Sequence, residues 1–302
     1  MKSVNSSLRQ EAMAPFLAII VGFACLGLAG GVVMAQESET SQKDWEDFDN
    51  TNFDEGSTNI DNQWLPLKPG MRWVYEGTTV EDEESIAHRV IFTVTDLTKV
   101  IDSVRTVVCW DRDFSDGELV ETEIVFFAQD KDGTVWHLGQ YPEEYEEGEF
   151  VDAPTWIHGI GDGKAGIMMK ANPKTGTPSY SQGWAPSVDW TDRGLVDQIG
   201  QETTVPAGSY EDVLVIAETS RGEPNAYQLK YYARGVGNVR VGWRGEDTSQ
   251  ETLELVRFRK LNAEEMGKAR RAALRLEKRA YQNSDDVYAN TQPAEQIVGT
   301  KE

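Results

Sequence analysis

Apolar and polar residues alternate with a period of two over most of residues 64–261. In residues 71–76, Met71, Trp73 and Tyr75 fall on one side and the residues between them on the other. The same spacing recurs in residues 90–94, 120–128, 227–231 and 239–243. Because successive side chains of a strand point to opposite faces, this pattern predicts a series of β-strands.

Short turn sequences separate these runs. Tight turns are predicted at Asp-Gly 116–117, at Asp-Gly 132–133 and at Pro-Ala-Gly 206–208. Asp and Gly tolerate a positive φ, and the ring of Pro fixes the φ of that residue at a value that suits a turn. Short connections join sequential antiparallel strands, and a sheet of about ten strands must curl. The fold class predicted for residues 61–261 is therefore mainly β: a large curved antiparallel meander sheet or an incomplete barrel.

The period changes to three and four residues over 262–282. Asn262 is suited to cap a helix, and Glu264 and Glu265 favour the positive end of its dipole. The apolar residues that share one side are Met266, Ala269, Ala273, Leu276 and Ala280. We predict a C-terminal amphipathic helix that either packs on its own domain or, through residues 262–281, docks a protein partner.

The first 35 residues carry the features of an export signal. Lys2 and Arg9 precede an apolar stretch at residues 14–35, which ends in a Val-Met-Ala cleavage sequence. We therefore predict a signal peptide at residues 1–35 and an exported protein of the periplasm, the cell surface or the medium. Because residues 14–35 are also long enough to span a bilayer, the alternative is an uncleaved membrane anchor with the bulk outside the cytoplasm.

Two polar segments flank the predicted domain and helix. Residues 36–60 are acidic and predict a disordered linker, and residues 283–302 predict a flexible tail. The formal net charge is -22, and removal of residues 1–35 would leave about -23. This acidic balance excludes sequence-independent binding of nucleic acid. It also argues against docking on anionic lipid, so contact with a membrane is expected only through residues 14–35, if they stay uncleaved.

The sequence contains no recognisable catalytic set. It has no G-x-S-x-G or H-E-x-x-H motif, its histidines lack metal-ligand spacing, and Cys109 lies in an apolar strand pattern typical of a buried inert thiol. No cofactor is expected, although a copper or zinc site from His137 and His158 stays open. Calcium is the more reasonable candidate, because carboxylates crowd two predicted turns. The candidate ligands are Asp111, Asp113, Asp116, Asp130 and Asp132. Backbone hydrogen bonding by turn aspartates is the alternative explanation.

Tryptophan is abundant, with nine residues in the chain. Five of them are candidate ligand-binding residues: Trp136, Trp156, Trp184, Trp190 and Trp243. Aromatic rings that gather on a surface can stack on sugar rings or line a groove for an apolar ligand. The alternative is that these rings fill the interior of a curled sheet.

Five segments occur along the chain in a fixed order. They are Pro-Leu-Lys-Pro-Gly at 66–70 with Trp73, Tyr75 and Gly77, Phe-Ala-Gln-Asp at 127–130, Ala-Asn-Pro-Lys at 171–174, Val-Pro-Ala-Gly at 205–208 with Asp-Val-Leu-Val at 212–215, and Lys-Tyr-Tyr-Ala at 230–233 with Gly-Val-Gly at 235–237. As a set they resemble a family of uncharacterised exported bacterial proteins over about residues 64–256. The resemblance implies export, and it transfers no catalytic residue.

We therefore expect an exported envelope protein without an enzymatic activity, most simply a binding or carrier module for an apolar or glycan ligand on a concave sheet face. Two alternatives remain open. One is a carboxylate-dependent hydrolase of envelope or extracellular polymer, which predicts two close carboxylates in a cleft. The other is a structural protein that docks through the helix.

Overall fold

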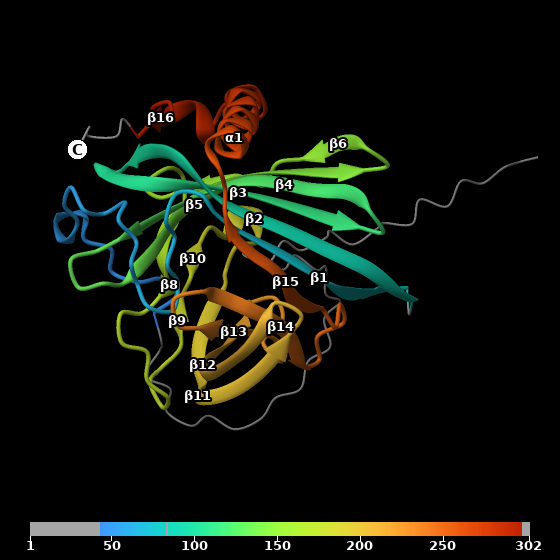
Figure 1. Cartoon of the computed structure of the whole chain (residues 1–302). Helices are drawn as coiled ribbons and strands as arrows, with labels where there is room; N and C mark the ends of the chain where they lie inside the picture. The colour runs from blue at the N-terminus through green and yellow to red at the C-terminus, as the bar shows by residue number, and fades with distance from the viewer. Residues whose placement is uncertain (1–42, 83, 298–302) are drawn as a thin grey trace, which may run out of the picture.

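The computed structural model of this protein describes residues 43–82 and 84–297. The described residues form one antiparallel sheet of sixteen strands and a helix near the C-terminus (Figure 1). The strands are β1 Met71–Glu81, β2 Glu84–Ile101, β3 Val104–Ser115, β4 Glu118–Gln129, β5 Val135–Glu146, β6 Glu149–Asp152, β7 Trp156–Ile157, β8 Lys164–Met169, β9 Tyr180–Ser181, β10 Gly183–Trp184, β11 Arg193–Val205, β12 Gly208–Thr219, β13 Ala226–Ala233, β14 Gly237–Gly245, β15 Thr252–Lys260 and β16 Glu295–Gln296. The helices are α1 Ala263–Asn283 and the short 3-10 helices η1 Asn50–Asn52, η2 Pro186–Val188 and η3 Tyr288–Asn290.

The sheet is a meander that curls almost into a barrel. Strands β1 to β5 are neighbours in sequence and in space, as are β11 to β15, and pairing of β1 with β15 joins the two halves. The strand order ends at β10 on one side and β9 on the other, and only Gln182 separates these two strands in the chain. No described strand closes the ladder between them. The predicted curved meander or incomplete barrel is confirmed.

The curl encloses an apolar core on the inner face of the sheet. Its members alternate along the strands and include Trp73, Phe92, Cys109, Phe127, Leu214 and Val241. A space of about 30 Å³ remains between Trp73, Phe92 and Tyr232, which is roughly the volume of one water molecule. Side chains therefore fill most of the space between these three rings and leave little room there for an apolar ligand.

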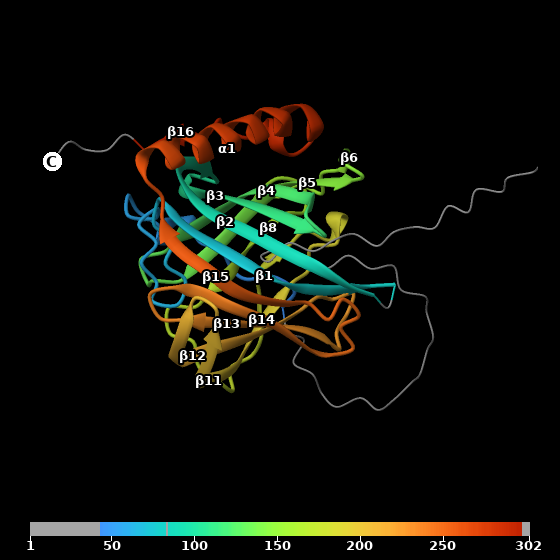
Figure 2. The ribbon, with the colours of Figure 1, turned by 45° about the vertical axis from the view of Figure 1, so that its right-hand side comes forward.

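Helix α1 lies across the outer face of the sheet, over β2 and β4 (Figure 2). Its predicted cap is present: Asn262 Oδ1 accepts from the backbone N–H of Glu265 at 2.9 Å, and the Glu265 carboxylate accepts from the backbone N–H of Asn262 at 3.0 Å. The buried seam consists of Ala269, Ala273, Leu276 and Ala280. Ala273, Leu276 and Ala280 of this seam belong to a second core cluster with Leu97 and Phe126, so the helix is packed on its own domain.

Parts of the two flanking segments are ordered, contrary to the predicted disordered linker and flexible tail. Within residues 43–60, Phe48 packs against the outer core, and Ile60 is fully buried in the inner core. After the helix, Tyr288 is fully buried, and β16 pairs with β2. A few large apolar side chains therefore anchor segments whose composition is otherwise polar.

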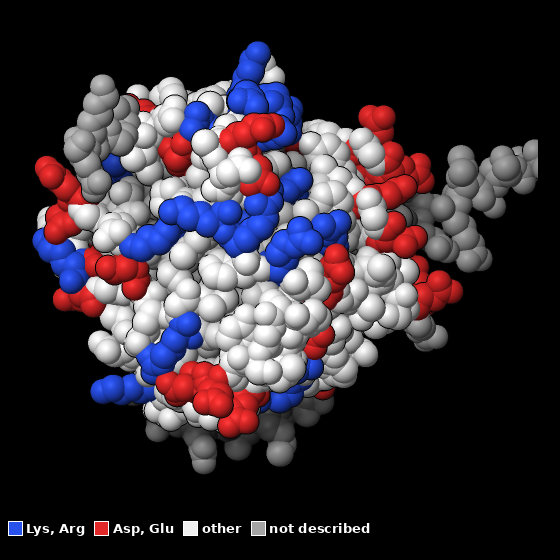
Figure 3. All heavy atoms as spheres, viewed as in Figure 1, with Lys and Arg blue, Asp and Glu red and all other residues white. Residues whose placement is uncertain are grey.

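The predicted signal peptide or membrane anchor at residues 1–35 lies outside the described residues, as do 36–42 of the linker and 298–302 of the tail. Within residues 43–82 and 84–297, no helix is both long enough and apolar enough to span a membrane. The surface charge is uneven: Figure 3 shows Lys and Arg gathered on α1 and in a band below it, with Asp and Glu mainly around them.

Candidate functional site

Four carboxylates lie next to one another on the inner face of β3 and β4. Because alternate residues of a strand share a face, Asp111 and Asp113 lie on one side of β3, and Glu121 and Glu123 lie on one side of β4. The register places Asp111 opposite Glu123, and Asp113 opposite Glu121. We call these four residues the acidic row. Like charges opposite one another in a ladder destabilise a sheet, so the rest of the fold must offset this arrangement.

The acidic row is buried, and the described residues supply too few hydrogen-bond donors for its oxygens. Both carboxylate oxygens of Glu123, and one oxygen of each of the other three residues, have no hydrogen-bond partner among the described residues. Burial and the neighbouring Asp113 raise the pKa of Asp111 to about 7. Burial and the nearby carboxylates also hold the pKa values of Glu121 and Glu123 well above their usual range. The row can therefore retain protons near neutral pH or accept hydrogen bonds from a cation.

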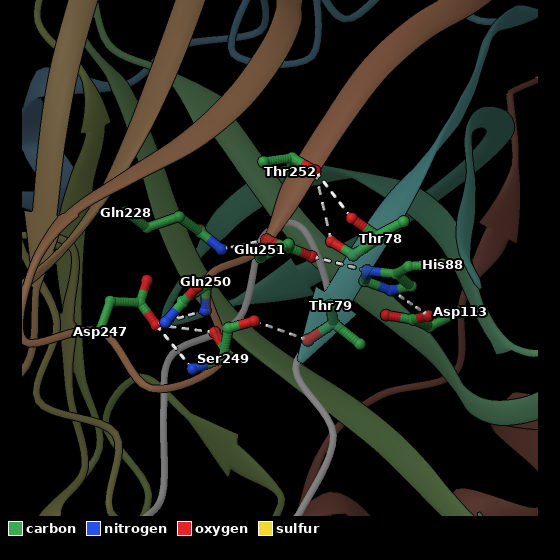
Figure 4. Close-up of polar contacts among 10 residues, drawn as sticks. All are labelled: Thr78, Thr79, His88, Asp113, Gln228, Asp247, Ser249, Gln250, Glu251 and Thr252. Atoms are coloured by element: carbon green, nitrogen blue, oxygen red, sulfur yellow. Dashed lines mark hydrogen bonds and ion pairs between the residues drawn. The ribbon is translucent and has the colours of Figure 1, made fainter. Parts of the chain in front are cut away.

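His88 on β2 ends the acidic row, because its ring lies between Asp113 and Glu251 (Figure 4). Its Nε2 lies 2.5 Å from Asp113 Oδ1, and its Nδ1 lies 2.9 Å from Glu251 Oε1. Gln228 donates a further hydrogen bond to Glu251. Burial opposes protonation of the ring, but the two carboxylates outweigh it and raise the pKa of His88 to about 10. This end of the row is thus closed by a buried imidazolium.

The other end of the row opens to solvent through Glu121. A groove of about 530 Å³ lies at this end, and the carboxylates of Glu121, Glu144, Asp152, Asp189 and Asp286 line it. Glu121 and Glu144 are directly opposite each other in the ladder between β4 and β5. Gln140 also lines the groove; it is 1% exposed, and its Oε1 has no partner among the described residues.

The groove has the electrostatic character of a cation site. None of the described residues that line it is Lys or Arg. Burial, Asp152 and Glu146 raise the pKa of Glu144 to about 7. An apolar wall accompanies the carboxylates and is formed by Pro142, Pro154, Val188, Trp190 and Val287. The combination suits a ligand with a cationic donor group and a hydrocarbon part.

The five predicted calcium ligands do not come together. Asp111 and Asp113 belong to the acidic row, whereas Asp116 occupies a hairpin turn at φ 46°. Asp130 accepts from the backbone N–H of Asp132 at 3.0 Å, as aspartates in turns commonly do. Across 43–82 and 84–297, no group of three or more His, Cys, Asp or Glu side chains is arranged to hold a metal ion.

The five candidate tryptophans are dispersed. Trp136, Trp156 and Trp190 are buried, Trp184 is half-buried, and Trp243 is 40% exposed at the end of β14. The ring centres of Trp156 and Trp190 lie 5.7 Å apart, with His137 packed against both at 4.7 and 5.4 Å. Of the five, Trp190 alone lines the groove. Most of these rings therefore fill the interior.

The site residues predicted from the sequence do not include Glu121, Glu123, Gln140 or Glu144. A usable signal was present, because residues 124–128 are apolar at every position. Such a run is typical of a strand covered on both faces, so the acidic residues just before it can also be buried.

No family model matches this chain, and no curated protein matches it. Two solved structures are similar to it. A protein of Bacteroides fragilis that is assigned as exported, with a YmcC-like fold, has 13% identity and a TM-score of 0.39, and the similarity covers 66% of this chain and 100% of that one. A protein of Parabacteroides distasonis that is assigned as a lipoprotein has 13% identity and a TM-score of 0.36, with 66% and 99% covered.

Proposed function

We propose that this protein is an exported binding protein whose ligand carries an ammonium or guanidinium group, held in the groove at Glu121 and Glu144. One observation carries the proposal. Glu121 and Gln140 present buried acceptor atoms that lack a donor among the described residues, and they face a groove lined by carboxylates. A buried acceptor without a donor is costly, and a cationic donor would satisfy it.

The apolar wall narrows the class of ligand. Pro142 and Trp190 lie beside the carboxylates, and an aromatic face can attract a cation as well as bury hydrocarbon. A linear polyamine, or a side chain of a cationic peptide, has both a cationic group for the carboxylates and a hydrocarbon part for the apolar wall. A neutral sugar would leave the carboxylates without a counter-charge. Export is supported by the Lys2 and Arg9 region and the apolar stretch that follows it.

Spermidine is a suitable probe for the groove. We expect calorimetric titration of the protein with spermidine to give binding that is stronger at pH 8 than at pH 5, because Glu144, with a pKa of about 7, is ionised at the higher pH. The double variant Glu121→Gln, Glu144→Gln should weaken binding at pH 8 by at least about tenfold.

The matched control is Glu118→Gln, Glu149→Gln, which changes the net charge equally at two exposed positions outside the groove. This control should bind spermidine as the parent does. Equal loss in the two double variants would mean that only net charge attracts the probe. No binding at either pH would contradict the proposal.

A second candidate is a carboxylate-dependent glycoside hydrolase. It is favoured by the placement of Glu121 opposite Glu144 in an open groove. Hydrolysis of this kind needs one carboxyl that stays protonated and one that ionises readily. Here burial raises the pKa of both, which favours binding over catalysis. Release of reducing ends from peptidoglycan by the parent, lost in both Glu121→Gln and Glu144→Gln, would support the hydrolase instead.

A further inference from the structure

Five arginines gather on the outer face of the sheet, beside the area that α1 covers. They are Arg72 on β1, Arg89 on β2, Arg112 on β3, and Arg257 and Arg259 on β15. The register places Arg72 opposite Arg259, and the charges of Arg72 and Arg89 both act on Arg112. We call these five residues the basic platform. It is unexpected in a chain whose net charge is -22.

The basic platform has too few counter-charges. Glu265 pairs with Arg259 at 2.7 Å, and Glu76 lies 3.7 Å from Arg89. No ion pair to a described residue is found for Arg72, Arg112 or Arg257. These arginines repel one another, and a bound anion would relieve that repulsion.

Among these arginines, Arg112 is the one whose guanidinium has a buried nitrogen without a partner among the described residues. That nitrogen is Nε, and the guanidinium stacks on Trp110 at 4.1 Å. Burial and the charge of Arg72 lower the pKa of Arg112 to about 10. A planar guanidinium held on an aromatic ring is well suited to bind phosphate oxygens.

Helix α1 extends the basic surface. Its solvent side carries the exposed residues Arg271, Arg275 and Lys278, and Leu274 lies among them at 38% exposure. Figure 3 shows Lys and Arg on the helix and in the band below it on one and the same side of the molecule. Basic residues around an exposed leucine are typical of helices that lie on a membrane surface.

We propose that the basic platform and the solvent side of α1 dock this protein on a membrane surface that presents anionic phosphate headgroups. A broad face of arginines spread over four strands fits an array of headgroups better than one small anion in a pocket. The negative net charge does not prevent this contact, because charges beyond about 10 Å are largely screened at physiological salt. An uncleaved anchor at residues 14–35 would also keep the chain at a membrane.

Vesicle co-sedimentation tests the proposal. The full chain, produced in a host that exports it, is mixed with vesicles of phosphatidylcholine alone or of equal parts phosphatidylcholine and phosphatidylglycerol. We expect selective binding to the anionic vesicles. The double variant Arg89→Glu, Arg257→Glu should lower that binding by at least about tenfold, since each basic residue near an anionic surface contributes several-fold. Both side chains are exposed, so folding should be retained.

The matched control is Lys174→Glu, Arg221→Glu, which makes the same charge change at exposed positions on other parts of the surface. It should bind anionic vesicles as the parent does. Arg112→Gln should also reduce binding without reversing a charge. Equal binding to both vesicle types, equal loss in the two double variants, or full competition by inorganic phosphate would each overturn the proposal. Binding of duplex DNA in preference to vesicles would overturn it as well. None of these outcomes depends on the groove.

Discussion

Glu143 and Glu144 are neighbours on β5, yet the two faces of the sheet treat their carboxylates in opposite ways. On the outer face, buried Glu143 accepts hydrogen bonds from Tyr141, Tyr145 and Arg279, and despite burial these donors lower its pKa. On the inner face, burial and nearby carboxylates raise the pKa of Glu144 to about 7. The outer face supplies hydrogen-bond donors to the Glu143 carboxylate. On the inner face, no described residue donates a hydrogen bond to the Glu144 carboxylate.

The same contrast extends beyond β5. Under α1, fully buried Lys99 donates to Glu277 at 3.0 Å, and Glu277 also accepts from Tyr288 and the backbone N–H of Ala294. Among the described residues, the inner acidic row accepts from His88 at one end and from the backbone N–H of Arg112. The charge of Lys230 also acts on Asp111 and Glu123, but five of the row's eight carboxylate oxygens have no donor among the described residues. Satisfied buried charge holds the helix in place, whereas the unsatisfied carboxylates of the row reach the groove at Glu121.

The largest effect on stability should come from breaking the buried ion pair between Lys99 and Glu277. We expect Lys99→Met to lower the free energy of unfolding by about 3–5 kcal/mol, because it leaves the Glu277 carboxylate buried without its counter-charge. Urea denaturation measures this loss. Lys99→Met, Glu277→Leu together should recover much of it, since no charge is then left buried.

The control for this pair is Lys268→Met, which breaks an exposed pair with Glu264 on the same helix and should change stability by less than about 1 kcal/mol. Comparable losses in Lys99→Met and Lys268→Met would mean that burial does not distinguish the two pairs.

A smaller effect should appear in the pH dependence of stability. Asp111 and Glu144 have pKa values of about 7 in the folded chain and about 4 when unfolded, so the folded chain binds more protons between these values. The free energy of unfolding should therefore fall, by about 2 kcal/mol or more, between pH 5 and pH 8. The unfolded chain releases a proton from each histidine over this range. His88, with a folded pKa of about 10, keeps its proton in the folded chain and so adds to the fall. Burial lowers the pKa of His137 to about 3, so His137 stays neutral in the folded chain and offsets the contribution of His88.

Glu123→Gln sharpens this test, because it removes one buried carboxylate without changing its shape. The variant should be more stable than the parent at pH 8 and should show a flatter pH dependence, measured by thermal unfolding across the range. Glu149→Gln, at an exposed position, should follow the parent curve. A parent protein whose stability rises steadily from pH 5 to pH 8 would contradict the raised pKa values of the acidic row.

Local sequence rules predicted the elements of this fold but not the charge on its inner face. The period of two gave the strands, and Asn262 gave the start of α1, because both are set by neighbouring residues. Burial of Glu121 and Glu123 depends on the curl of the whole sheet, which brings distant strands over β4. Order in residues 43–60 likewise depends on Ile60 reaching a core built by later strands.

The smallest effect should come from removing one of the donors to Glu143. Arg279→Gln leaves that carboxylate with Tyr141 and Tyr145, so we expect a loss of about 1 kcal/mol at pH 7 in urea denaturation. The pKa of Glu143 is lowered in the folded chain, so its contribution is present above the unfolded pKa and is lost as pH falls through the folded value. The loss caused by Arg279→Gln should accordingly shrink in acid, opposite to the trend of Glu123→Gln. The same pH trend in Arg279→Gln and Glu123→Gln would mean that the outer and inner faces of the sheet do not differ in how their carboxylates bind protons.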